Sequence, residues 1–209
     1  MNILDIQPNF WLYWFVFCGI IMSGYFITAA GIYWLLYSIL GKQLPGLKSK
    51  NRQQRRSAIA EDIKLSILSV NFFALGAACF IVSYNWGHTQ VYIQWKIQDL
   101  GYLAFSYIAV LLLQDTHFYF MHRLFHLPLL FKWFHRGHHL SKPPTPWTFF
   151  ALEPMEALVQ ASFLLCITFV IPLHIGVLLA ILLTMTVWAL GNHLGFQVVV
   201  VRKPHQAEF

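Results

Sequence analysis

Histidines recur at short, regular intervals in two neighbouring stretches of the sequence. His122 and His126 are four residues apart, and His135, His138 and His139 follow within the next thirteen residues. Side chains four residues apart lie on one face of a helix, so His122 and His126 can bind one metal ion or one each of a close pair. Neutral imidazole is the commonest metal ligand in proteins and suits iron and zinc. The two stretches therefore predict a metal site.

Further polar residues flank these histidines. Asp115 and Tyr119 lie two turns and one turn before His122 on the same predicted helix face, where they could orient the imidazole rings as hydrogen-bond acceptors. The alternative for this stretch is a polar helix end that reaches the membrane surface. Much later in the chain, Asn192 and His193 end the last apolar stretch. We interpret His193 as a sixth candidate ligand and Asn192 as a weaker one.

The elements that must position these residues are apolar. The chain has 209 residues, of which 58% are hydrophobic and only 11% charged, whereas soluble domains carry about 25% charged residues. Charged side chains are absent from four stretches, residues 10–41, 65–95, 100–114 and 157–201. A helix needs roughly 20 apolar residues to cross a bilayer. We therefore predict an all-α integral membrane bundle of about four to five transmembrane helices, at residues 10–40, 64–84, 99–117, 156–173 and 175–194.

The basic residues predict how this bundle is oriented. With five spans, every lysine and arginine except Lys96 falls on the side that carries the histidine clusters. The positive-inside rule makes that side cytoplasmic and leaves the N-terminus outside. The net charge of +6 is then a topology signal, and we expect no nucleic-acid partner. We expect a multi-pass protein of the bacterial inner membrane or the endoplasmic reticulum.

Two regions are expected along the chain. Residues 1–98 would form N-terminal transmembrane helices with a basic cytoplasmic linker at 42–64, and residues 99–209 would carry the metal site. The prolines of the segment 141–147 predict an extended strap between the second histidine cluster and the next span. Glu153 and Glu156 follow it and are interpreted as complementing a helix N-terminus. The three cysteines lie in apolar stretches without paired spacing and are expected to be free thiols.

The histidine pattern resembles a known family. Asp-x3-Tyr-x2-His-Arg-x2-His at residues 115–126, followed by His-x2-His-His and Asn-His-x-Gly, is similar to the fatty acid hydroxylase / sterol desaturase superfamily over roughly residues 100–196. The resemblance implies a membrane oxygenase with a non-haem di-iron centre at the cytoplasmic face. It implies iron ligation by His122, His126, His135, His138 and His139, with His193 near the metals. Asp115, Tyr119 and Arg123 match flanking motif positions.

The sequence departs from the family pattern in two respects. The family has a third His-x2-His-His cluster after the Asn-His-x-Gly segment, but only His205 follows it here, before Phe209. In addition, Gln197 stands where many members have Glu, and Ala151 where a histidine is common. Six matched histidines are few for two irons. We expect an incomplete C-terminal region; the alternatives are a single metal or a site completed by another subunit.

The resemblance implies the reaction and its partners. We expect hydroxylation or desaturation of a membrane lipid (a sterol, a fatty acyl chain or a related lipid) with dioxygen as co-substrate. The sequence lacks a haem-attachment motif, an iron–sulphur cysteine set and a dinucleotide-binding glycine loop. Electrons would therefore come from a separate protein, such as a reductase or a small haem or iron–sulphur carrier.

Three other interpretations remain open at the level of the sequence. A zinc-dependent membrane lipid hydrolase would need fewer ligands. A histidine-rich metal transporter would place its ligands near the bilayer midplane, whereas these histidines lie at helix ends and in a loop. A truncated, non-catalytic family member would keep the fold without the reaction.

Overall fold

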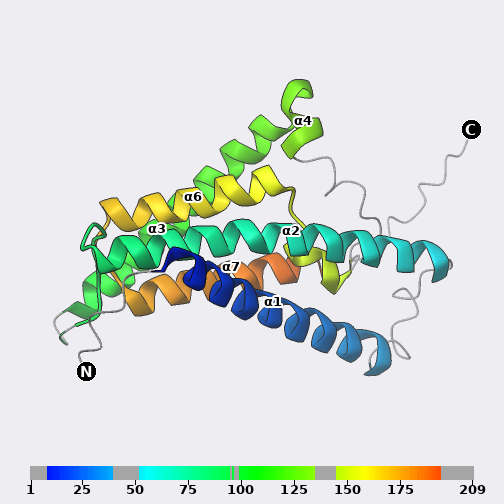
Figure 1. Cartoon of the computed structure of the whole chain (residues 1–209), viewed down its shortest axis with the longest axis horizontal. Coiled ribbons are helices and arrows are strands. Elements are labelled where there is room, and N and C mark those ends of the chain that lie inside the picture. Colours follow the sequence, from blue (N-terminus) through cyan, green and yellow to red (C-terminus); the bar gives the residue numbers. More distant parts are fainter. Residues whose placement is uncertain (1–8, 40–51, 95, 97–98, 135–144, 194–209) are drawn as a thin grey trace, which may run out of the picture.

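A computed structural model of the chain describes residues 9–39, 52–94, 96, 99–134 and 145–193, and nearly all of them are helical (Figure 1). The long helices are α1 (Phe10–Trp34), α2 (Arg52–Asn85), α3 (Leu100–Phe125), α6 (Pro154–Val170) and α7 (Ile175–Asn192). The short elements are the π-helical turn η2 (Leu35–Ile39), β1 (Val91–Tyr92), α4 (Pro128–Phe134), the 3-10 turn η6 (Pro146–Phe150) and β2 (Leu173–His174).

Four helices are long and apolar enough to cross a membrane. They are α1, residues Arg56–Asn85 of α2, α3 and α7, and α6 is a shorter apolar helix of 17 residues. The chain is thus an integral membrane protein, and the prediction of an all-α bundle with about four to five spans is confirmed.

Two helices extend beyond the predicted membrane spans. α2 begins at Arg52, so the second half of the expected linker is helical, because this part is rich in Arg, Gln and Ala, which favour helix. α3 continues past residue 117 to Phe125 and stops before Pro128. No proline interrupts residues 100–127. The histidine motif therefore forms the last two turns of α3, in direct continuation of its apolar part.

A short parallel pairing of β1 with β2 ties the loop after α2 to the turn between α6 and α7. Val91 is in register with Leu173, and Tyr92 with His174. The His174 ring donates from Nε2 to the carbonyl of Ile93 at 2.7 Å and accepts the amide of Gly176 at Nδ1 at 3.0 Å. His174 therefore caps the N-terminus of α7.

Small residues allow the helices to approach closely at the centre of the bundle. Ala74, Ala78 and Ala157 are completely buried, and a Cβ atom added to Gly76 would lie 3.1 Å from the Cβ of Ala161. Close contact through small side chains is how helices associate in lipid, where apolar burial adds little. α2 and α6 consequently pack side by side along much of their length (Figure 1).

The turn η6 is held against α1 and α2 by buried hydrogen bonds. Thr148 donates to the Asp62 carboxylate at 2.7 Å and accepts the amide of Thr145 at 2.9 Å. Tyr25 of α1 donates to the carbonyl of Trp147 at 3.0 Å. The expected extended strap is therefore wrong for its last residues, because Pro146 starts a 3-10 turn, a position where its missing N–H has no cost. Residues 141–144 lie outside the described part of the chain.

Candidate metal site

His122 and His126 face each other at the end of α3. Their Nε2 atoms are 3.1 Å apart and their ring centroids 4.7 Å apart. Both residues belong to the last turn of the helix, His126 as its C-terminal cap. The four-residue spacing thus brings two potential ligand atoms together, as the helical geometry predicts.

The separation of these two nitrogens fits a shared metal ion. An imidazole nitrogen lies about 2.1 Å from a bound metal such as zinc, so two ligands are roughly 3.0 Å apart at a right angle and roughly 3.4 Å apart at a tetrahedral angle. The observed 3.1 Å lies between these two distances. Without a metal, one ring must donate its Nε2–H to the other; with a metal, both Nε2 lone pairs would face the ion.

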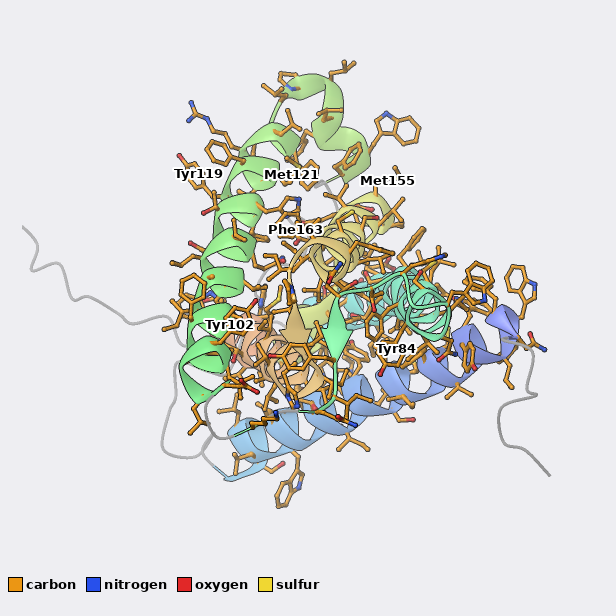
Figure 2. The ribbon with its side chains drawn as sticks, turned by 90° about the vertical axis from the view of Figure 1, so that its left-hand side faces the viewer. Tyr84, Tyr102, Tyr119, Met121, Met155 and Phe163 are labelled. Carbon is orange, nitrogen blue, oxygen red and sulfur yellow. The ribbon has the colours of Figure 1, made fainter. Side chains whose placement is uncertain are left out.

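An open hollow of about 470 Å³ surrounds this pair. It is lined by Asp115, Phe118, Tyr119, His122, Arg123 and His126. Tyr119 lies on the side of α3 that faces away from the bundle, opposite Met121 and Phe163 (Figure 2). The predicted helix face therefore exists as one continuous surface, and it borders the outside of the bundle.

Asp115 and Tyr119 line the same hollow as the histidine pair. Both side chains are exposed. Their expected role as acceptors for the imidazoles stays a prediction. Arg123 is exposed beside them, at the rim of the same hollow.

His193 lies at the C-terminal end of α7. Its Nδ1 donates to the carbonyl of Ala189 at 2.7 Å, which fixes the tautomer and leaves the Nε2 lone pair as the potential ligand. Asn192, its neighbour, lines a second hollow on α7 together with Trp188 and Gly191. α3 and α7 are joined by the hydrogen bond between Tyr107 and Thr184 at 2.6 Å.

The described residues contain only part of the predicted ligand set. Among them no group of three or more His, Cys, Asp or Glu side chains is close enough to hold a metal ion. His135, His138 and His139 lie outside the described residues, in a segment bounded by Phe134 of α4 and Thr145 before η6. Phe134 stacks on Phe125 with ring centroids 4.8 Å apart, so α4 folds back onto the end of α3.

Several buried polar groups outside the histidine motif form contacts that the sequence did not predict. Asp62, which was expected in the linker, is only 1% exposed. Glu156 lies in the first turn of α6, as expected for a carboxylate at a helix N-terminus, and is also 1% exposed. Gln114 donates from its amide to Gln160 at 2.9 Å, between α3 and α6. The sequence held one indication of this contact, because each of two apolar stretches contains a glutamine and polar side chains in the membrane need partners.

Comparisons with known proteins agree with the motif. The model of the fatty acid hydroxylase family matches residues 107–208. Human lathosterol oxidase is 28% identical over 189 residues, covering 86% of this chain and 59% of the relative. Rat lathosterol oxidase is 27% identical over 163 residues, with coverages of 74% and 53%.

A fungal relative points in the same direction. The Delta(7)-sterol 5(6)-desaturase of Gibberella zeae is 26% identical over 140 residues, covering 67% of this chain and 43% of the relative. The chain thus spans about half the length of the curated relatives it matches. No solved structure matches it significantly.

Proposed function

Because the chain belongs to the fatty acid hydroxylase / sterol desaturase superfamily, we propose that it hydroxylates or desaturates a membrane lipid at a histidine-held non-haem iron site. The observation that carries this proposal is the 3.1 Å separation of the His122 and His126 Nε2 atoms. The pair lies inside the residues that match the family model, and its geometry suits two ligands of one metal.

The proposed centre contains two irons. His122 and His126 would bind from α3, His135, His138 and His139 from the following segment, and His193 from the end of α7. When bound, the irons would activate dioxygen so that an unactivated C–H bond of the lipid can be oxidised. Imidazole ligands suit iron, and the carbonyl of Ala189 already holds the His193 ring in the tautomer needed for binding through Nε2.

The substrate is proposed to reach the histidines from the bilayer. The hollow around His122 and His126 borders the outside of the bundle, and Phe118 and Tyr119 give it an apolar, exposed wall. A lipid could therefore slide along α3 without first leaving the membrane, and the protein would bind and orient it. The named activities of the relatives favour a sterol or a similar rigid lipid as the substrate.

The proposal also names the membrane side of the site and the source of its electrons. We propose that the histidine face is cytoplasmic, because the basic residues gather at that end of the helices. A separate carrier, either a reductase or a small haem or iron–sulphur protein, would dock at the same face and deliver the two electrons that each turnover requires.

Product analysis tests the proposal. The chain, expressed in membranes supplied with an electron-transfer system, should convert a sterol substrate to a hydroxylated or unsaturated product when dioxygen is present. The variant His122→Ala should form no product. His88→Ala is the matched control, because His88 is exposed at the opposite end of the bundle. Oxidation that survives in His122→Ala, or hydrolysis with zinc as the only metal, would refute the proposal.

A further inference from the structure

A second polar site lies between α3 and α6, inside the apolar part of the bundle. Gln114 and Gln160 are 4% and 7% exposed, and they share a single hydrogen bond from Gln114 Nε2 to Gln160 Oε1 at 2.9 Å. Neither glutamine belongs to the histidine motif. An amide has two polar ends, so each glutamine uses only half of its capacity in this contact.

Three polar atoms at this interface have no hydrogen-bond partner. They are Gln114 Oε1, Gln160 Nε2 and His117 Nδ1, and all three are buried. The His117 ring stacks on Phe163, with centroids 3.9 Å apart and planes 10° from parallel. His117 and Phe163 each lie one turn from the paired amides along their helices (Figure 2 shows Phe163 between α3 and α6). The unpartnered atoms thus lie within one helical turn of one another along α3 and α6, and we treat them as one cluster.

Such a cluster favours an occupant that can form hydrogen bonds with it. A buried polar atom without a partner costs about 1–3 kcal/mol in a protein and more in hydrocarbon. The hydrogen bond between the two amides leaves one acceptor and one donor without a partner. If both amides are flipped, so that oxygen and nitrogen change places, one acceptor and one donor still remain. A hydroxyl group can donate to one atom and accept from the other, whereas a carbonyl or an ammonium group can satisfy only one of them.

We propose that Gln114, Gln160 and His117 bind a hydroxyl group within the membrane, supplied by an alcohol-bearing lipid or by a water molecule. The lipid source rests on the proposed function and extends it. Eight residues separate Gln114 from His122, which is about 12 Å along α3. A lipid alcohol held at the amides would therefore present to the histidines a carbon remote from its own hydroxyl.

Binding measurements on the purified full chain test this site without any turnover. Cholestanol and cholestane share one hydrocarbon skeleton and differ by the hydroxyl, so their thermal-shift titrations isolate its contribution. The wild type should bind cholestanol about tenfold more tightly than cholestane, as expected for one or two hydrogen bonds. Gln160→Met, which keeps the side-chain length but removes the donor, should bind both equally. Gln94→Met is the matched control at an exposed position and should keep the preference.

An experimental structure at a resolution that shows ordered water separates the two sources. A preference for cholestanol that disappears in Gln160→Met assigns the hydroxyl to a lipid. Equal binding of the two lipids, together with an isolated oxygen within hydrogen-bond distance of both amides, assigns it to water. Equal binding without such an oxygen overturns the site. Because neither measurement needs iron, a cholestanol preference in a chain that oxidises nothing would refute only the proposed function.

Discussion

At the scale of single residues, the site depends on two imidazoles that face each other across one helical turn. At 3.1 Å, the Nε2 atoms of His122 and His126 are within hydrogen-bond distance of each other, so the metal-free pair must hold a proton between them. A metal ion would take the place of that proton, and the donor ring would then carry its N–H on Nδ1, because ligation requires the lone pairs of both Nε2 atoms.

Substitution of His126 tests the pair directly. The variant His126→Ala removes one of the two candidate metal ligands of α3. We expect iron affinity to fall at least about 100-fold, because even the loss of a group that only supports a ligand costs about 10–100-fold. Metal titration of purified protein measures the change. His88→Ala, at the opposite end of the bundle, should bind iron like the wild type, and equal losses in the two variants would contradict a specific role for His126.

The sequence predicts this pair because two residues of one helix need only local geometry to meet. The contacts between Asp62 and Thr148, or between Gln114 and Gln160, join residues that are 86 and 46 positions apart. Local spacing carries no information about such partners. From the sequence alone, Asp62 is expected in a linker and Gln114 has no predicted partner.

At the scale of elements, the turn η6 connects the histidine-bearing region to the bundle. It is fixed by the hydroxyl of Thr148, which bridges the Asp62 carboxylate and the amide of Thr145, and by the aromatic contacts of Tyr25 with Trp147 and Phe149. Because α6 begins only four residues after η6, this anchor also sets where α6 enters the membrane.

Thr148→Val tests the anchor. Valine keeps the shape of threonine but removes both hydrogen bonds of the hydroxyl inside a buried site. We expect the free energy of unfolding to fall by about 1–3 kcal/mol, measured by reversible denaturation in mixed micelles. Thr148→Ser should restore most of the stability. Thr186→Val is the control, because Thr186 is exposed and its hydroxyl bonds to its own helix. An equal fall in the free energy of unfolding of Thr186→Val would contradict the anchoring role of Thr148.

Gly76→Val tests the packing of α2 against α6. The new Cβ would lie 3.1 Å from Ala161, so the helices would have to separate along the seam of small residues. We expect a destabilisation of about 1–3 kcal/mol, as for other overpacked interiors, measured by thermal unfolding. A Cβ at Gly19 on α1 meets no atom within 4 Å, and Gly19→Val should cost about 0.5 kcal/mol or less. A Gly76→Val protein as stable as Gly19→Val would contradict this packing.

At the scale of the whole molecule, the number of helices and their order could be predicted because stretches without charge mark membrane spans. Which face of each helix is buried could not be predicted. Helices such as α1 are apolar all round, since lipid and protein interior are equally apolar, so hydrophobic periodicity does not reveal which side packs. The helix through the first histidine motif was predicted from its spacing, and the structure shows that it continues without a break from the apolar stretch before Asp115.

The orientation of the bundle in the membrane can be tested. Single cysteines at position 88 or position 123, in a chain whose native cysteines are replaced by alanine, can be labelled in sealed right-side-out vesicles. An impermeant maleimide should modify His88→Cys from outside, but Arg123→Cys only after the vesicles are opened, because the basic end is expected to be cytoplasmic. Labelling of both positions from the same side would contradict the proposed topology.

The central claim is that imidazoles at one end of the helices bind iron, and metal analysis tests it most directly. The purified chain is loaded anaerobically with ferrous iron and freed of unbound metal, and its iron content is compared with that of the double variant His122→Ala/His126→Ala. We predict a pair of irons in the wild type and a loss of bound iron in the variant. A wild-type chain that retains no more iron than the double variant would contradict the account.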